Sequence, residues 1–249
     1  MPGREGPYPW RRIIAGAFAA VVWTAAYAKD SPTSVKEAEQ YIAKGDLKAA
    51  EIELRNAVRD APQDPVLHAR LAEVYLREGD PLSAEREARA ARERNGNEAD
   101  YLPVLADALL RQEKFADLID LAQPGVRDPV LESKIRTALG LAAAGLHDQT
   151  KAETLLGEAI KLDPTVARPK IELARLLSGS KPAEADKLID EAISAAPRSA
   201  EPLQVKGEML RSRGDQEGAI RLFDEALKID PKNLSAHLSR ANVNITLVP

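Results

Sequence analysis

The feature of this sequence that most constrains its fold is a pattern of residues that recurs about every 34 positions. The copies contain Tyr41, Gly45-Asp46 and Ala50; Tyr75, Gly79-Asp80 and Ala84; Leu109, Glu113-Lys114 and Leu118; His147-Asp148 and Ala152; and, after one copy shortened by a residue, Leu210, Gly214-Asp215 and Ala219. A fixed period of this length is the signature of an array in which each unit packs against its neighbours. The sequence therefore predicts a solenoid of similar units.

Further lines of residues run in the same register. The first line of small residues is Ala38, Ala72, Ala106, Gly140, Ala174, Gly207 and Ala241, and the second is Ala57, Ala91, Gly125, Ala159, Ala192 and Ala226. Prolines close units at Pro62, Pro164, Pro197 and Pro231. Helices approach closely where side chains are small, glycine adopts the left-handed conformation that often ends a helix, and proline stops one. Each unit is predicted to be two helices, with Leu54, Leu156, Ile189 and Phe223 filling the space between helices.

These residues and their spacing resemble the tetratricopeptide repeat, a helix-turn-helix unit. The resemblance implies an all-α, right-handed superhelical solenoid of antiparallel helix pairs. Repeats are expected at about 31–64, 65–98, 99–132, 133–166, 167–199 and 200–233, with a partial repeat at 234–249. Composition favours the same class, because alanine, leucine, glutamate and arginine dominate and are strong helix formers.

Two parts of the array depart from the pattern. Pro124-Gly125 should break or shorten the second helix of the third repeat. The last helix, from Ser235 to about residue 246, has apolar residues at Leu238, Val243 and nearby positions, but no second helix follows it. Terminal repeats need a polar outer face. We therefore expect either that the chain continues in a longer parent or that this edge self-associates.

The first 28 residues have the features of a secretory signal peptide. Arg11-Arg12 precede an apolar run from Ile13 to Trp23, and Ala26-Tyr27-Ala28 is a small-residue cleavage site. We expect cleavage after Ala28, a repeat array over residues 29–249 and a periplasmic or cell-envelope location in a Gram-negative bacterium. The alternative is an uncleaved N-terminal anchor, which would be the only attachment to a membrane.

A narrower resemblance rests on the order of the repeats, the signal peptide and the run from Tyr101 to Leu110. Leu121-Ala122-Gln123-Pro124-Gly125 and Asp230-Pro231-Lys232-Asn233 fit it as well. Together they resemble the N-terminal part of PrsT-type tetratricopeptide-repeat proteins of bacterial PEP-CTERM/exosortase systems. The resemblance implies a role outside the cytoplasmic membrane, in exopolysaccharide production and protein sorting.

The sequence offers no catalytic residue, metal site or cofactor motif. Cysteine is absent, the three histidines are scattered, and neither a nucleophile elbow nor a glycine-rich phosphate loop is present. His68 and His237 fall in equivalent positions that favour packing over metal binding. Acidic and basic residues are interleaved at a net charge of −4, which argues against nucleic acid as a partner.

The expected function is non-catalytic binding of other proteins along a groove lined by the first helices. The candidate groove residues are Glu39, Glu73, Arg77, Asp107, Arg111, Arg175, Glu208 and Arg211. Pairs such as Glu73 with Arg77 could instead only stabilise an exposed helix. Two other functions stay open: a polysaccharide-binding or export subunit, and the repeat module of a longer enzyme. Sugar binding would need exposed aromatic residues, and most of Tyr41, Tyr75, Tyr101, Phe115 and Phe223 fall in core positions.

Overall fold

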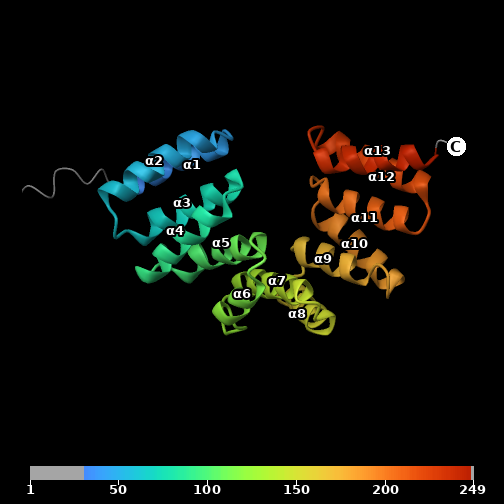
Figure 1. Ribbon diagram of the computed structural model, residues 1–249, viewed down its shortest axis with the longest axis horizontal. Coiled ribbons are helices and arrows are strands. Elements are labelled where there is room, and N and C mark those ends of the chain that lie inside the picture. The colour runs from blue at the N-terminus through green and yellow to red at the C-terminus, as the bar shows by residue number, and fades with distance from the viewer. Residues whose placement is uncertain (1–30, 248–249) are drawn as a thin grey trace, which may run out of the picture. The chain divides into compact units, whose positions relative to one another are not determined.

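A computed structural model describes residues 31–247, with side chains described from residue 35 to residue 243. The predicted signal peptide lies outside these residues. Every element within them is an α-helix, which confirms the all-α class (Figure 1). The helices are α1 (Ser31–Ala43), α2 (Leu47–Asp60), α3 (Pro65–Glu78), α4 (Pro81–Glu93), α5 (Glu98–Arg111), α6 (Phe115–Leu121), α7 (Pro129–Gly145), α8 (Gln149–Leu162), α9 (Arg168–Leu177), α10 (Pro182–Ala195), α11 (Glu201–Ser212), α12 (Gln216–Ile229) and α13 (Leu234–Leu247).

Consecutive helices pack as pairs: α1 on α2, α3 on α4, α7 on α8, α9 on α10 and α11 on α12. We call the odd-numbered helices the first helices and the even-numbered ones the second helices. The chain divides within α5 into two compact units, one ending at Tyr101 and the other beginning at Leu102. The repeated helix pair is the arrangement that the tetratricopeptide-repeat pattern predicts.

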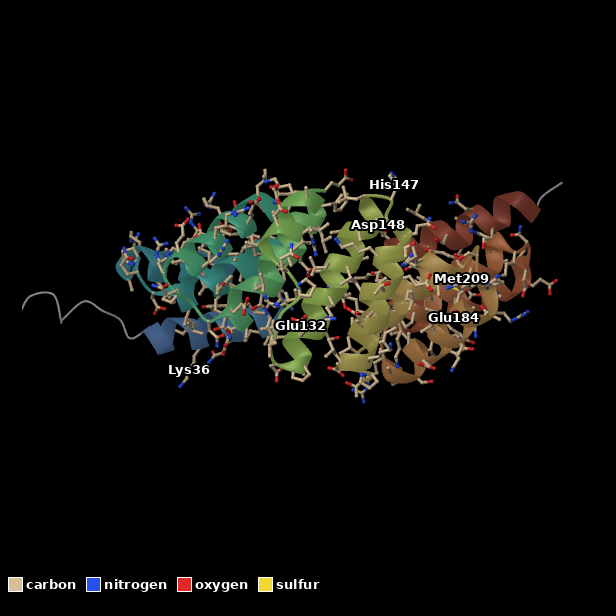
Figure 2. The ribbon with its side chains drawn as sticks, turned by 90° about the horizontal axis from the view of Figure 1, so that it is seen from below. Lys36, Glu132, His147, Asp148, Glu184 and Met209 are labelled. Atoms are coloured by element: carbon tan, nitrogen blue, oxygen red, sulfur yellow. The ribbon has the colours of Figure 1, made fainter. Side chains whose placement is uncertain are left out.

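In four helix pairs the turn is fixed by a left-handed residue followed by an aspartate that caps the second helix. Gly79 has φ +83°, and Asp80 donates its N–H to Tyr75 O at 2.9 Å while its carboxylate accepts from Ser83 N at 3.0 Å. Gly45 and Gly214 also have positive φ, as predicted. His147 takes the same conformation, with φ +63°, and Asp148 caps α8 (Figure 2). This turn reverses the chain after α1, α3, α7 and α11, whereas the turn from α9 to α10 has no left-handed residue.

The small-residue positions are contacts between the two helices of a pair. A β-carbon on Gly140 would lie 2.8 Å from Leu156, and one on Gly207 would lie 2.6 Å from Phe223. The alanines of the repeat pattern are at most 1% exposed: Ala38, Ala50, Ala72, Ala84, Ala106, Ala152, Ala174 and Ala219. The predicted large core residues Leu54, Leu156, Ile189 and Phe223 are fully buried.

Two members of the small-residue lines differ from the expected role. Gly125 lies exposed in the loop between α6 and α7, because α6 ends at Leu121 after only seven residues. This confirms that Pro124-Gly125 interrupts the third repeat. Ala241 on α13 is exposed, since no second helix covers it among the described residues.

The closing prolines also accept hydrogen bonds. The second helices α2, α8, α10 and α12 each end two residues before a closing proline. The carbonyl oxygens of Pro62, Pro164 and Pro231 then accept from the side chain six positions later, which is His68, Lys170 or His237, at 2.8–3.0 Å. Each such bond ties the turn between repeats to the next first helix.

Candidate binding site on the first helices

Three of the predicted groove residues lie in the unit that ends at Tyr101. Glu39 on α1 and Arg77 on α3 are exposed, and Glu73 is partly buried. Glu73 Oε2 lies 3.3 Å from Arg70 Nη1. Glu73 therefore pairs with Arg70, one turn earlier on its own helix, and not with Arg77 as in the alternative interpretation. Arg77 is left at the surface.

Two more predicted residues come together in the unit that begins at Leu102. Arg175 on α9 lies 3.1 Å from Glu208 on α11, and Gln204 donates to the same carboxylate at 2.9 Å. Gln204 also contacts Ser235 on α13 at 2.6 Å. Polar contacts thus link three successive first helices, while Arg211 remains exposed near the end of α11.

Asp107 pairs with a residue that the sequence analysis did not single out. The two terminal guanidinium nitrogens of Arg168 donate to the Asp107 carboxylate, at 3.1 and 3.3 Å, although the two residues are 61 positions apart. Asp107 lies on α5 and Arg168 begins α9, so the ion pair joins first helices of non-consecutive repeats. Arg111 is exposed at the end of α5.

A cavity of about 300 Å³ lies beside this ion pair, between α5, α7 and the start of α9. Its lining residues are Pro103, Ala106, Asp107, Ser133, Lys134, Thr137, Ala138, Val166, Arg168 and Pro169. Ser133 donates to Ala159 O and Thr137 donates to Ser133 O, so both hydroxyl protons are already used. What remains is an apolar hollow with charged groups at its edge.

The charged side chains at the edge of the cavity do not fully neutralise one another. Burial opposes the charge on Arg168, but Asp107 more than offsets burial and the pKa of Arg168 is raised, with smaller contributions from Glu172 and Glu201. Arg168 therefore stays cationic, and its charge is balanced by Asp107. Lys134 is exposed, and its ammonium has no hydrogen-bond or ion-pair partner within the part of the chain that the structure describes. The cavity edge carries a net positive charge.

Glu172 lies on α9, between Arg168 and Arg175 in sequence. Burial raises the pKa of Glu172 and Glu201 adds to the rise, while Arg175 and Arg168 lower it by less. Its nearest cation is Arg175 at 3.9 Å, and Arg175 is already paired with Glu208. The ionised form of this carboxylate is poorly compensated.

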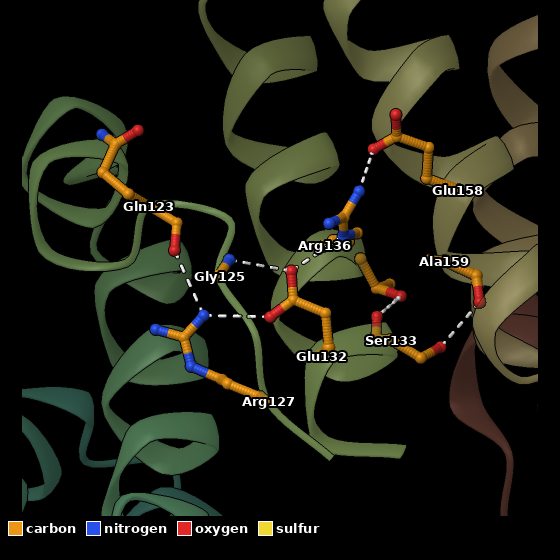
Figure 3. Close-up of polar contacts among 9 residues, drawn as sticks. Gln123, Gly125, Arg127, Glu132, Ser133, Arg136, Glu158 and Ala159 are labelled. Atoms are coloured by element: carbon orange, nitrogen blue, oxygen red, sulfur yellow. Dashed lines mark hydrogen bonds and ion pairs between the residues drawn. The ribbon is translucent and has the colours of Figure 1, made fainter. Parts of the chain in front are cut away.

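A buried carboxylate fixes the loop next to the cavity helix α7. Glu132 accepts from Arg127 at 2.9 Å, from Arg136 at 2.8 Å and from Gly125 N at 3.1 Å (Figure 3). Burial alone would raise the pKa of Glu132, but these hydrogen bonds outweigh burial and lower it. Arg136 also reaches Glu158 on α8. The charged network holds the irregular loop after α6 against the start of α7.

The most informative residues missed from the sequence are Lys134 and Arg168. They are 34 positions apart and occupy the same position in consecutive repeats, so the repeat register itself contained the signal. The candidate groove residues lie in the C-terminal halves of the first helices. The structure shows that the middle of α7 and the first turn of α9 also line the cavity.

The histidines are spread over different repeats. His68 is buried, with Nδ1 2.7 Å from Glu87 and Nε2 3.0 Å from Pro62 O, whereas His237 is exposed. Among the described residues no cluster of three histidine, aspartate or glutamate side chains has a geometry that could hold a metal ion. Within residues 31–247 no helix has the length and apolar character that crossing a membrane requires.

Comparison with known sequences gives matches to repeat proteins. Residues 207–247 match the family model described as TPR repeat. The chain is 27% identical over 199 residues to cellulose synthase operon protein C of Xanthomonas axonopodis pv. citri (strain 306), covering 76% of this chain and 13% of that protein. It is 26% identical over 212 residues to tetratricopeptide repeat protein 34 of Homo sapiens, covering 82% and 34%. The chain thus spans about a third or less of the length of these relatives.

Solved structures show the same fold. Pseudomonas aeruginosa pilF matches with a TM-score of 0.61 and 20% identity, covering 85% of this chain and 96% of that structure. PilW, described as a widely conserved type IV pilus biogenesis factor, matches with a TM-score of 0.65 and 17% identity, covering 83% and 96%. The described residues therefore have the tetratricopeptide-repeat fold, which is generally a scaffold for binding other proteins.

Proposed function

We propose that this chain is a non-catalytic scaffold of the bacterial periplasm that binds a protein partner along its first helices. The partner would belong to the machinery for exopolysaccharide production or PEP-CTERM protein sorting. The observation that carries the proposal is the cavity between α5, α7 and α9, with its apolar lining and charged edge. A hollow of this kind suits side chains of a partner segment laid across the first helices.

Similarity to other proteins supports the cellular setting. The name of the Xanthomonas relative places that protein in a cellulose synthase operon, and PilW is described as a pilus biogenesis factor. Both concern the cell envelope, in agreement with the signal peptide expected at residues 1–28. Because the chain spans 13% of the Xanthomonas protein, the activity of a longer parent is part of the proposal.

Direct binding of polysaccharide is the second candidate function, and the side chains favour it less. Tyr75 and Phe223 are buried, and no aromatic residue lines the cavity. Sugar rings usually stack on exposed aromatic faces, as nucleic-acid bases do in their own binding proteins. A protein segment is the better match to an aliphatic hollow with charged edges.

An affinity experiment tests the protein partner. The full chain, immobilised, would be exposed to envelope extract of its host, and retained proteins would be identified by mass spectrometry. The Arg77→Glu/Arg111→Glu variant would be run in parallel. Two charged contacts at about 1.5–3 kcal/mol each predict a loss of at least a hundredfold in affinity. Circular dichroism should show unchanged helicity, since both side chains are exposed.

Three results would contradict the proposal. Equal titration affinity of the variant for the identified partner would place binding away from the first helices. Retention of cellulose or an acidic exopolysaccharide in affinity electrophoresis, without any protein partner, would favour the second candidate. N-terminal sequencing of protein from a cytoplasmic fraction that begins at Met1 would exclude export.

A further inference from the structure

We infer that the cavity between α5, α7 and α9 is a pocket for a peptide in which a large apolar residue adjoins a carboxylate, and that Asp107 is an internal competitor displaced from Arg168 by that carboxylate. This inference rests on the proposed function and names the chemistry of the partner. It concerns only residues of the unit that begins at Leu102.

The size and lining of the cavity select an apolar side chain. About 300 Å³ is at the lower limit of ligand pockets, which suits one or two side chains better than a cofactor or an oligosaccharide. Pro103, Ala106, Ala138, Val166 and Pro169 supply the apolar surface. Because the Ser133 and Thr137 hydroxyl protons are bound to backbone carbonyls, the wall offers few donors to a polar ligand.

The edge of the cavity selects a negative charge next to that side chain. Lys134 and Arg168 are the cations of the lining and Asp107 is its anion. Lys134 has no partner among the described side chains, so it can accept an ion pair without breaking one. A peptide carboxylate between Lys134 and Arg168 would complete the charge balance of the site.

The ion pair of Asp107 and Arg168 is exposed enough to exchange. The side chains are 31% and 50% exposed, and pairs at this level of exposure contribute little stability. An incoming carboxylate can therefore replace Asp107 when its apolar neighbour is buried at the same time. Removing the Asp107 charge should tighten binding, an outcome of opposite sign to the loss expected if Asp107 itself contacted the ligand.

The first experiment identifies the sequence preference. A random peptide library displayed on phage would be selected on the immobilised full chain and counter-selected on the Val166→Trp variant, whose larger side chain should fill the cavity. Enriched peptides should share a large apolar residue beside aspartate or glutamate. Enrichment of peptides without the acid, or no enrichment over the filled variant, overturns the inference.

The second experiment measures one enriched peptide, fluorescein-labelled, by anisotropy against a set of variants. Lys134→Gln and Arg168→Gln should each weaken binding about three- to tenfold, between the effects of an exposed ion pair and a charged hydrogen bond. Asp107→Asn should strengthen binding about two- to fivefold. In the Asp107→Asn/Arg168→Gln double variant that gain should vanish, because no guanidinium is left to release.

Asp224→Asn is the matched control, since Asp224 forms an ion pair of similar exposure with Arg240 outside the cavity lining. It should leave peptide affinity unchanged. Weaker binding by Asp107→Asn, or a gain that persists in the double variant, overturns the displacement of Asp107. If the cavity binds no peptide while a partner from envelope extract still depends on Arg77 and Arg111, the inference fails and the proposed scaffold function stands.

Discussion

At the scale of single residues, Glu172 is a carboxylate whose charge the fold disfavours. Its pKa is raised chiefly by burial and also by Glu201. The folded state therefore binds this proton more tightly than the unfolded state does. The resulting stabilisation is complete below the unfolded-state pKa of about 4.3 and is lost as the pH rises through the higher folded-state pKa.

Replacing this carboxylate should stabilise the protein at neutral pH. Glu172→Gln is expected to raise the free energy of unfolding by about 0.5 kcal/mol at pH 7. The gain should vanish below about pH 4, where Glu172 is protonated in both states. Urea titrations across this pH range measure it. Glu208→Gln is the control of opposite sign, because its carboxylate accepts from Arg175 and Gln204. A destabilised Glu172→Gln protein at pH 7 would contradict the prediction.

His147 offers a second stabilising change. It holds the left-handed conformation that Gly45, Gly79 and Gly214 occupy in other repeats. That conformation costs a non-glycine residue about 1–2 kcal/mol. Glycine avoids this strain but loses more backbone entropy on folding, which offsets part of the gain. His147→Gly should therefore stabilise by about 0.5–1 kcal/mol. Gly214→Ala should destabilise by a similar amount, and thermal melts of both variants check the pair. If both variants changed the melting temperature in the same direction, strain of the left-handed conformation would be excluded as the cause.

At the scale of elements, Glu132 carries the connection between the short helix α6 and α7. Its carboxylate receives hydrogen bonds from two arginines and from Gly125 N. Glu132→Gln should cost about 3 kcal/mol, because it removes the buried carboxylate that pairs with Arg127 and Arg136, which are only 15% and 22% exposed. Amide exchange should accelerate over residues 122–128. Glu158→Gln, which removes the more exposed partner of Arg136, should cost under about 1 kcal/mol.

The lowered pKa of Glu132 also predicts that the stability of the protein decreases in acid. Since the pKa of Glu132 is lowered in the folded state, its contribution is present above the unfolded-state pKa and is lost as the pH falls through the folded-state value. Stability of the wild type should thus decline below about pH 4 more steeply than that of Glu132→Gln. Parallel slopes for the two proteins would mean that Glu132 titrates alike in the folded and unfolded states.

The helices were predictable because their causes are local and periodic. Turn glycines, buried alanines and closing prolines repeat in register, so each copy supports the interpretation of the others. The shortening of α6 followed from Pro124-Gly125 alone. The contacts of Glu132 could not be predicted from the sequence, since they depend on how the loop from Ala122 to Asp128 folds back on α7. No sequence pattern specifies that path.

At the scale of the whole molecule, the sequence predicted that charged side chains line the first helices but not which of them pair. The contact between Arg175 and Glu208 joins adjacent repeats at equivalent positions. The contact between Asp107 and Arg168 skips a repeat, which the packing of each repeat on its neighbours does not predict. The cavity depends on that packing and could not be located by residue spacing alone.

The exposed face of α13 leads to a prediction for the repeat array. Leu234 and Leu238 are 69% and 56% exposed, and Ala241 lacks the cover that Phe223 gives to Gly207 in the preceding repeat. A designed helix with a polar outer face, patterned on α12 and added after residue 247, should cover these residues. Burying a leucine contributes about 1.5–3 kcal/mol, so the melting temperature should rise by several degrees. Concentration-dependent association in light scattering should fall.

The control is an added helix in which serine replaces the large apolar residues. It should change neither the melting temperature nor the association. If the protein is monomeric at high concentration and the apolar helix leaves the melting temperature unchanged, then α13 already closes the array without a cap.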